Sequence, residues 1–373
     1  MNKKKILIVC NYKWTYHVFL EKLSKILGNS YDVDICCDMS VTKTDGDDKG
    51  VNFINLYIPN KPKIFSFIKS VLSLRRIIIL NNYDMIISNN RNASFISRVV
   101  FFFLYRKIFK IYISRGMYFH DAQNIIKKFI AIFIEYILYF RTDLILSQST
   151  EDYFFFSRLF FVNKKYLSII GNGIDEKFFI SSNNIIFKKK INICTIGRYS
   201  KLKNFNFLLL VFKEFLNYNN EAHLTFIGGD IEGSEAENEI KHVIKLLDLS
   251  DKVTLTGVVK SSKYYLDQHD IYIHPSLREG VPRSVLEAMA MKKIVIASNI
   301  RGCREIISNE KNGFLFNVND KKELINIMLK VSNLNEVDIE RIRNNARSTV
   351  ENKYSEKLYL KNQLDKINNF FEK

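Results

Sequence analysis

The sequence predicts an α/β protein with two Rossmann-like domains, and three observations support this prediction. The chain has 373 residues, which is too long for one ordinary hydrophobic core and suits two domains. Hydrophobic residues make up 47% of the chain and charged residues 25%, a balance typical of globular proteins. Short apolar runs separated by helical lengths occur in two successive series. Such runs indicate parallel sheets that are covered by helices on both faces.

The first series lies in residues 1–175, the predicted N-terminal domain. Its apolar runs are the length of buried strands, and amphipathic spacing appears between the first two. The sequence therefore predicts a helix over Val18–Leu27 and strands over Ile6–Cys10, Val33–Cys37, Met85–Ser88, Ile111–Ser114 and Leu144–Leu146. Asn, Ser and Lys then cluster, which predicts an interdomain linker over residues 176–190.

The second series occupies residues 191–354, the predicted C-terminal domain. Its helices are expected over Phe205–Tyr218, residues 235–247 and Ser284–Met291. Its strands are expected over Ile191–Ile196, Leu224–Ile227, Val253–Thr256, Ile271–His274, Ile294–Ala297 and Gly313–Phe316. Ser355–Phe371 alternates apolar and charged residues at helical spacing. We expect residues 355–373 to form a C-terminal helix that packs back on the N-terminal domain.

The chain is strongly basic, with a formal net charge of +17 and a pI of about 9.4. Nucleic acid, an anionic membrane surface and phosphorylated ligands all remain possible partners. Residues 51–141 contain 14 basic residues, and their only acids are Asp84, Asp121 and Glu135. Biased nucleotide composition of the genome would explain many lysines, but it would not explain the missing acids.

The first apolar run has five residues, Ile6–Cys10, and is too short for a signal-peptide core. No uncharged apolar run reaches the roughly 18 residues of a membrane span. The five cysteines and six histidines are scattered without metal-binding spacing. We therefore expect a cytoplasmic protein with buried thiols and no metal site.

Two groups of residues follow predicted strands, where ligands bind in open parallel sheets. The first runs from Gly197 to Asn204 and places Arg198 and Lys203 beside a helix start, which suits a diphosphate. Taken alone, this group is better explained as an exposed basic loop.

The second group runs from His274 to Ala290. Pro282 suits a first helical residue, which would turn the backbone N–H groups of Arg283 and Ser284 toward an anion. Glu279 in the loop and Glu287 in the helix could then reach opposite ends of one extended ligand and accept hydrogen bonds from its hydroxyl groups. The alternative is an exposed loop acid and a helix-surface acid.

Together these residues resemble retaining GT-B glycosyltransferases of family 4 (glycosyl transferases group 1). The resemblance covers most of the C-terminal half. Its motifs are Asn172-Gly173-Ile174-Asp175, Gly197-Arg198 with Lys203, Gly228-Gly229, Gly257, Glu279-x7-Glu287, Gly302-x2-Glu305-Ile306-Ile307 and Asn312-Gly313-Phe314-Leu315-Phe316.

The resemblance implies a GT-B fold, in which two parallel sheets face each other across a cleft that holds a nucleotide-sugar donor. It implies that Arg198 and Lys203 bind the donor diphosphate in place of a metal and stabilise the leaving group. Glu279 would hold hydroxyls of the transferred sugar, and Glu287 those of the ribose. Gly257 and Val259 would lie near the base. The remaining donor-binding residues would be Gly197, and Gly280, Val281, Arg283 and Ser284 around the sugar and diphosphate.

The N-terminal half matches the family less well. The Gly-Gly loop that often follows the first strand in the family is replaced here by Asn11–His17. His120 lies where the family often has a histidine that contacts the transferred sugar, and a structural histidine is the alternative.

Residues 51–141 also suggest a membrane surface. Ile64–Leu74 forms an amphipathic helix on a helical wheel, and Phe101–Ile113 mixes aromatic residues with Arg106, Lys107 and Lys110. Such a surface suits the headgroup layer of an anionic bilayer. The alternative is that the apolar residues build the core of the domain.

The sequence thus predicts a metal-independent enzyme, without a cofactor, that moves a sugar from a nucleotide donor, most simply a UDP-sugar, to a glycan or lipid-linked acceptor. The product would be a bacterial capsule, lipopolysaccharide O-antigen or exopolysaccharide, made peripherally on the inner face of the cytoplasmic membrane. The rivals are a non-hydrolysing nucleotide-sugar epimerase of the same architecture, a catalytically silent sensor and a nucleic-acid-binding protein. The last does not explain acids beside Arg198, Lys203 and Arg283, so no nucleic-acid partner is expected.

Overall fold

The computed structural model describes residues 3–40, 50–59, 64–104, 106–116, 124–158, 164–181, 191–230 and 234–371. The chain divides into two compact units. Unit 1 is Met1–Gly171 with Leu360–Lys373, and unit 2 is Asn172–Tyr359. Residues 176–181 of the predicted linker belong to unit 2, and residues 182–190 lie outside the described residues. The described helices include none that is long and apolar enough to cross a membrane.

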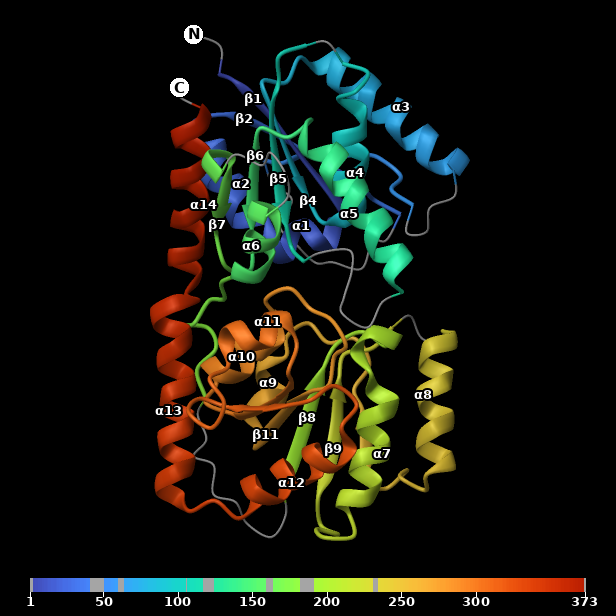
Figure 1. Cartoon of the computed structure of the whole chain (residues 1–373), viewed down its shortest axis with the longest axis vertical. Coiled ribbons are helices and arrows are strands. Elements are labelled where there is room, and N and C mark those ends of the chain that lie inside the picture. The colour runs from blue at the N-terminus through green and yellow to red at the C-terminus, as the bar shows by residue number, and fades with distance from the viewer. Residues whose placement is uncertain are drawn as a thin grey trace. The chain divides into compact units, whose positions relative to one another are not determined.

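Unit 1 contains a seven-stranded sheet in which all pairs are parallel, in the order β3-β2-β1-β4-β5-β6-β7 (Figure 1). Its strands are β1 Lys5–Tyr12, β2 Asp32–Asp38, β3 Asn52–Asn55, β4 Met85–Asn89, β5 Phe109–Ser114, β6 Leu144–Ser147 and β7 Leu167–Ile169. The five predicted strands are confirmed. The two missed strands, β3 and β7, are the edges of the sheet, and they are too short to show a buried apolar run.

The helices of unit 1 lie in the connections between these strands. They are α1 Lys13–Phe19, α2 Glu21–Gly28, α3 Ile64–Asn81, α4 Arg91–Val100, α5 Ile125–Tyr139, α6 Thr150–Arg158 and the short η1 Lys164–Tyr166. The helix α14, Glu356–Phe371, begins in unit 2, and its residues from Leu360 onward belong to unit 1.

The prediction of one helix over Val18–Leu27 was wrong. The chain turns into α1 directly after β1, and it breaks at Leu20 before α2 begins. Tyr16 in α1 is fully buried, and its hydroxyl lies 2.9 Å from the Ser24 hydroxyl in α2. A buried tyrosine that keeps a polar partner does not register as part of an apolar stripe, which is why the pattern missed α1.

The helices α3, α4 and α5 cover one face of the unit 1 sheet. Residues of α3 and α4 share a core with Leu7 and Val9 of β1, and α5 packs beside Tyr112 of β5, which points to the same face. A buried ion pair joins α4 to α5. Arg98 Nη1 and Nη2 donate to the two carboxylate oxygens of Glu135 at 2.8 and 3.1 Å, and the guanidinium carbon lies 4.0 Å from the Tyr112 ring centroid.

Unit 2 contains a six-stranded parallel sheet in the order β10-β9-β8-β11-β12-β13. Its strands are β8 Asn192–Ile196, β9 His223–Ile227, β10 Val253–Leu255, β11 Ile271–His274, β12 Ile294–Ser298 and β13 Phe314–Phe316. Its helices are η2 Lys201–Lys203, α7 Phe205–Phe215, α8 Glu235–Leu246, α9 Lys263–Asp267, α10 Arg283–Ala290, α11 Arg301–Ile306, α12 Lys321–Ser332 and α13 Glu336–Lys353. Every predicted strand of this unit is confirmed.

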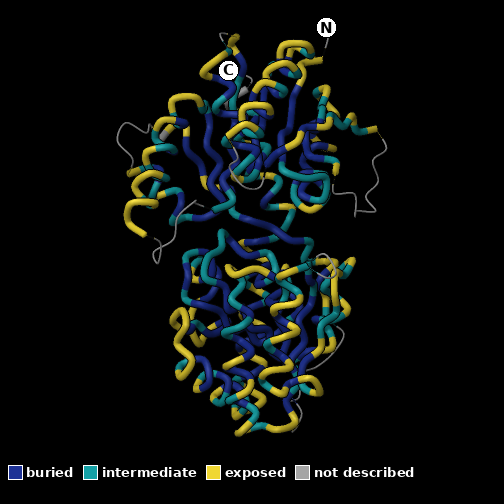
Figure 2. Tube along the Cα trace, turned by 90° about the vertical axis from the view of Figure 1, so that its right-hand side faces the viewer, coloured by how far each residue is buried: buried dark blue, intermediate teal, exposed yellow. Residues whose placement is uncertain are grey.

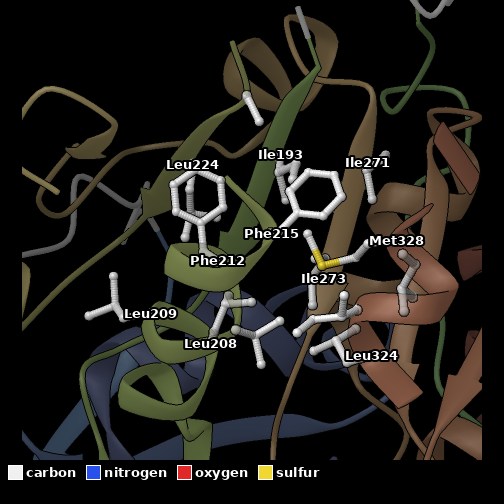
Figure 3. Packing of buried hydrophobic residues seen from close by; sticks show 14 of the residues in the cluster. Ile193, Leu208, Leu209, Phe212, Phe215, Leu224, Ile271, Ile273, Leu324 and Met328 are labelled. Carbon is white, nitrogen blue, oxygen red and sulfur yellow. The ribbon is translucent and has the colours of Figure 1, made fainter. Parts of the chain in front are cut away.

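Two hydrophobic clusters hold the unit 2 sheet between its helices. On one face, Phe212 and Phe215 of α7 pack with Ile193 and Ile271 of the sheet and with Met328 of α12 (Figure 3). On the other face, α9, α10, α11 and α13 cover Cys194, Tyr272 and Val295. In both units the strands are buried and exposed residues lie mainly on helices and turns (Figure 2). Unit 2 therefore has the doubly wound architecture in which strand ends form ligand sites.

The Arg98–Glu135 pair gives a test of the packing in unit 1. Glu135→Ala leaves a buried guanidinium without its carboxylate, so we expect the free energy of unfolding to fall by about 3–5 kcal/mol. Urea denaturation followed by circular dichroism measures the change. The double variant Arg98→Met/Glu135→Leu removes both charges and should lose less stability than the single variant. Unfolding of Glu135→Ala at the wild-type urea concentration would show that the pair does not hold α5 to α4.

Candidate functional site

The candidate site lies at the carboxyl edge of the unit 2 sheet, between β8 and β11. β8 is paired with β9 on one side and with β11 on the other. The chain leaves β8 toward α7 on one face of the sheet, and it leaves β11 toward α10 on the opposite face. A crevice for a ligand forms at such a reversal of strand order. The loop after β8 carries Gly197–Lys203 and the loop after β11 carries Pro275–Pro282. The two groups that the sequence singled out therefore belong to adjacent loops.

The loop after β8 brings Lys203 back over Gly197. A Cβ atom built at Gly197 would lie 2.9 Å from Lys203 Cε, so a larger residue would force the lysine stem to shift from its place over the strand end. The short helix η2 then ends at Asn204, whose left-handed φ of 57° redirects the chain into α7. A backbone hydrogen bond from Leu277 N–H to the Leu202 carbonyl, at 2.8 Å, ties this turn to the loop after β11.

The side chains of Lys203 and Glu279 join the two loops. Lys203 Nζ donates to Glu279 Oε1 at 2.7 Å, and both side chains remain 22% exposed. Burial favours a higher pKa for Glu279, but the Lys203 charge outweighs it and holds the pKa well below its ordinary value. Glu279 is therefore a carboxylate at neutral pH, able to accept hydrogen bonds from hydroxyl groups.

A second line of polar groups lies behind Glu279 inside the protein. His274 Nε2 lies 3.5 Å from Glu279 Oε1, and His274 Nδ1 lies 2.9 Å from the Tyr272 hydroxyl. That hydroxyl donates to Ser284 Oγ at 2.8 Å, at the start of α10. Burial lowers the pKa of His274, so the ring is neutral at physiological pH. The sequence quoted His274 as part of a motif but did not find this role, because Tyr272 lies within an apolar strand.

Glu287 belongs to a separate network on α10. Arg283 Nε donates to Glu287 Oε1 at 3.1 Å, and Ser262 Oγ donates to Glu287 Oε2 at 2.8 Å. Burial raises the pKa of Glu287, and Arg283 and Ser262 oppose the rise. The two acids of the motif are thus held by different partners, as expected for acids that bind different parts of one ligand.

The predicted helix start at Pro282 was wrong by one residue. Pro282 has an extended ψ of 117° and precedes the helix, which begins at Arg283. The residue that precedes a helix has non-helical dihedral angles, and a proline in this position has no side-chain group that could cap the helix. The N–H groups of Arg283 and Ser284 still lie in the first turn, where no intrahelical acceptor is available.

The loop between Glu279 and Pro282 is packed from outside the motif. A Cβ atom at Gly302, in α11, would lie 1.3 Å from the Gly280 carbonyl oxygen and 3.1 Å from Pro282 Cδ. Asn172 Nδ2 donates to the Val281 carbonyl at 2.9 Å. Two separate family-like motifs in the sequence therefore act on one loop, which the sequence order alone could not show.

The remaining predicted residues have plain positions. Arg198 is exposed just beyond Gly197, and Gly257, with its left-handed φ of 68°, is bridged to Gly228 at the neighbouring strand ends. Val259 is half-buried beyond Gly257. His120 lies outside the described residues. The described residues contain no group of three His, Cys, Asp or Glu side chains that could hold a metal ion.

Unit 1 has polar residues at its own carboxyl sheet edge that the sequence did not single out. Asn11, near the end of β1, accepts a hydrogen bond from Ala93 N–H at 3.0 Å and so caps α4. Arg115 Nε donates to the buried Asn89 side chain at 2.6 Å. Asparagine and arginine after strands resemble ordinary loop residues in a sequence, which is why no pattern indicated them.

The contact at Gly302 predicts a large effect from a small change. Gly302→Ala must displace the Gly280 carbonyl, and overpacking of this kind costs about 1–3 kcal/mol or more. Thermal melts should show a clear loss of stability. Gly28→Ala is the matched control, because no atom lies within 4 Å of its new Cβ. An unchanged melting temperature for Gly302→Ala would contradict the packing described here.

The Lys203–Glu279 pair predicts a pH dependence. Because the folded-state pKa of Glu279 is lowered, its charge stabilises the fold above its ordinary pKa of about 4.3, and this contribution is lost as the pH falls through and below that value. Glu279→Gln should therefore melt below wild type at pH 7, and the difference should stay nearly constant down to about pH 5 and shrink as the pH falls further. A difference that already shrinks between about pH 7 and pH 5, or that grows below pH 5, would contradict the pairing.

Comparisons with known proteins agree with this geometry. Residues 176–349 match the family model described as Glycosyl transferases group 1. The chain is 25% identical over 372 residues to the UDP-Gal:alpha-D-GlcNAc-diphosphoundecaprenol alpha-1,3-galactosyltransferase of Escherichia coli, covering 95% of this chain and 92% of that protein. It is 28% identical over 354 residues to the capsular polysaccharide biosynthesis glycosyltransferase CapM of Staphylococcus aureus, covering 90% of each.

The fold is similar to that of solved structures. Anabaena Alr3699/HepE, in complex with UDP and glucose, superposes with a TM-score of 0.79 at 16% identity, covering 98% of this chain and 99% of that one. Together with the two Rossmann-like units, this likeness identifies the fold as GT-B. The family match covers both loops of the candidate site and supports a glycosyltransferase. The chain therefore has a GT-B fold, and residues 176–349 of its second unit are similar to the glycosyl transferases group 1 model.

Proposed function

We propose that the protein is a retaining, metal-independent glycosyltransferase that uses a UDP-sugar donor in the synthesis of a bacterial surface polysaccharide. The observation that carries the proposal is the contact between Lys203 and Glu279 at the reversal of strand order in unit 2. It places a cation, a carboxylate and the first turn of α10 at one sheet edge, which are the groups that a diphosphate and a sugar require.

We propose that the donor lies along this edge and that different residues bind its diphosphate, sugar, ribose and base. Lys203 and Arg198 bind the diphosphate, Glu279 accepts hydrogen bonds from sugar hydroxyls, and Glu287 accepts them from the ribose. The base lies toward Gly257 and Val259. The relatives' names support a UDP-sugar, since one is a UDP-Gal transferase and the solved Anabaena protein holds UDP and glucose.

The reaction breaks the bond between the anomeric carbon of the sugar and the diphosphate oxygen. The acceptor hydroxyl attacks from the side that the diphosphate leaves, so the configuration at that carbon is retained, and the hydroxyl proton passes to the departing diphosphate. Arg198 and Lys203 stabilise the negative charge that grows on the leaving group. Such stabilisation is commonly the largest single contribution to catalysis of this kind.

We propose a glycan on a lipid carrier as the acceptor, which the protein meets while attached peripherally to the inner face of the cytoplasmic membrane. The names of two relatives support this proposal. One names a diphosphoundecaprenol-linked sugar, and the other names capsular polysaccharide biosynthesis.

The test combines binding and turnover. UDP should raise the melting temperature of the wild type, and Arg198→Ala or Lys203→Ala should abolish this shift. Turnover of the donor sugar found in a nucleotide-sugar screen should fall by about 10²–10³-fold in Lys203→Ala, because one charge-stabilising group is lost. Glu279→Ala should lose transfer while the fold survives.

Lys201→Ala is the matched control, since Lys201 lies in the same short helix η2 and is exposed. It should keep both the shift and the turnover. Near-wild-type turnover in Lys203→Ala or Glu279→Ala would contradict the site assignment. Release of an altered free sugar without an acceptor would indicate an epimerase, and inversion at the anomeric carbon, read from the product by NMR, would contradict retention.

A further inference from the structure

The helix α5 of unit 1 exposes a continuous apolar face. Among its residues Phe129 is 66% exposed and Phe133 is 62% exposed, values unusual for phenylalanine in a soluble domain. Successive exposed apolar residues follow at helical spacing along one side, namely Ile126, Ile130, Phe133, Ile137 and Phe140. Large continuous apolar patches of this kind mark interaction sites.

The ion pair with Arg98 turns this face outward. Glu135 is the only acidic residue of α5, and it is 1% exposed because Arg98 of α4 binds both of its carboxylate oxygens. Rotation of the helix about its axis would expose Glu135 and break the pair. A charge within the apolar run, which the sequence presents as an interruption, therefore keeps an uncharged face on the outside.

The helix α3 extends the surface on the same side of the sheet. Phe65 is 90% exposed, and Ile68, Leu72 and Ile79 follow it at helical spacing along one side. The helix α4 contacts both α3 and α5, and only Arg91 of its residues is fully exposed. The two outer helices, α3 and α5, thus carry apolar residues out from one face of the sheet (Figure 1).

Basic residues accompany these apolar residues on α3 and α5, whereas the one acid of these two helices, Glu135, is buried. Lys69 and Arg76 are exposed on α3, and Lys127 is exposed on α5. Arg141, just after α5, lies with its guanidinium carbon 4.8 Å from the Phe102 ring centroid. Of the acids in the described part of residues 51–141, Glu135 is buried, and Asp84 accepts a hydrogen bond from Lys5 N–H at the amino end of the sheet.

We propose that the outer faces of α3 and α5 dock on an anionic lipid bilayer, with Phe129 and Phe133 of α5 inserted among the headgroups. An apolar face beside basic residues is the pattern of helices that lie in a membrane interface. The basic residues attract the anionic lipid, and the aromatic side chains supply the attachment that remains when salt screens the charges. The docking proposal depends on the proposed function only for the purpose of this surface, which is to bring unit 1 to an acceptor held in the membrane.

Flotation of the full chain with vesicles tests the proposal. The wild type should float with vesicles of phosphatidylglycerol and phosphatidylethanolamine, and much less with phosphatidylcholine alone. Phe129→Ser/Phe133→Ser should lower the affinity for these vesicles by about a hundredfold, since each buried phenylalanine contributes about tenfold. Lys127→Glu should weaken binding mainly at low salt.

Leu246→Ser/Val337→Ser is the matched control, because both residues are large, apolar and exposed on helices of unit 2. This variant should float like the wild type. The UDP-induced melting shift should be unchanged in both double variants, so loss of flotation and loss of donor binding are separate outcomes.

Two results would overturn the proposal. One is a wild type that does not float with anionic vesicles, or a Phe129→Ser/Phe133→Ser variant that floats as well as the wild type. The other is a self-associated wild type that becomes monomeric in that variant, by light scattering, without any vesicle binding. The face would then be an interface between copies of the chain.

Discussion

The contact between Lys203 and Glu279 is the interaction on which the candidate site depends. It connects the loops that follow two neighbouring strands, β8 and β11, and a backbone hydrogen bond from Leu277 to Leu202 runs beside it. Glycines make the contact possible. Gly197 leaves space for the lysine stem, and Gly302 lets α11 press against the loop that carries Glu279. Loss of any of these features would move the cation and the carboxylate apart.

The two units use their charges differently. In unit 2 the site cation Lys203 and the neighbouring Arg283 are each paired with an acid of the motif, so the charges that face a ligand are balanced and oriented before it arrives. Preorganised charges of this kind lose little energy to reorganisation during a reaction. In unit 1 the basic residues of α3 and α5 stand beside exposed apolar side chains, and the one acid of α5 is buried. The paired charges of unit 2 add nothing to the overall charge of +17, whereas the basic residues of α3 and α5 do.

Much of the fold could be predicted from the sequence because the central strands are buried on both faces. Ile6–Cys10 and Ile294–Ala297 are apolar at every position, and such runs are distinctive. The edge strands β3 and β7 could not be predicted, since a short strand at a sheet edge needs no apolar run. The helix α1 was missed because its buried residue, Tyr16, keeps a hydroxyl partner.

Part of the candidate site could be predicted from motifs in the sequence. Glu279, Glu287, Arg198 and Lys203 lie in motifs that the sequence shows directly. The contact of Tyr272 with His274 and Ser284, and the packing of Gly302 against Gly280, became visible only in the structure. The proposed surface of α3 and α5 required burial as well as sequence, because the apolar residues of Ile64–Leu74 could equally have formed the core.

A crystal structure of the protein with UDP tests the central claim most directly. The account predicts a diphosphate within hydrogen-bonding distance of Arg198 and Lys203, and ribose hydroxyls that donate to Glu287. Binding of UDP with the diphosphate away from Lys203, or at any place other than the carboxyl edge of β8 and β11, would contradict it.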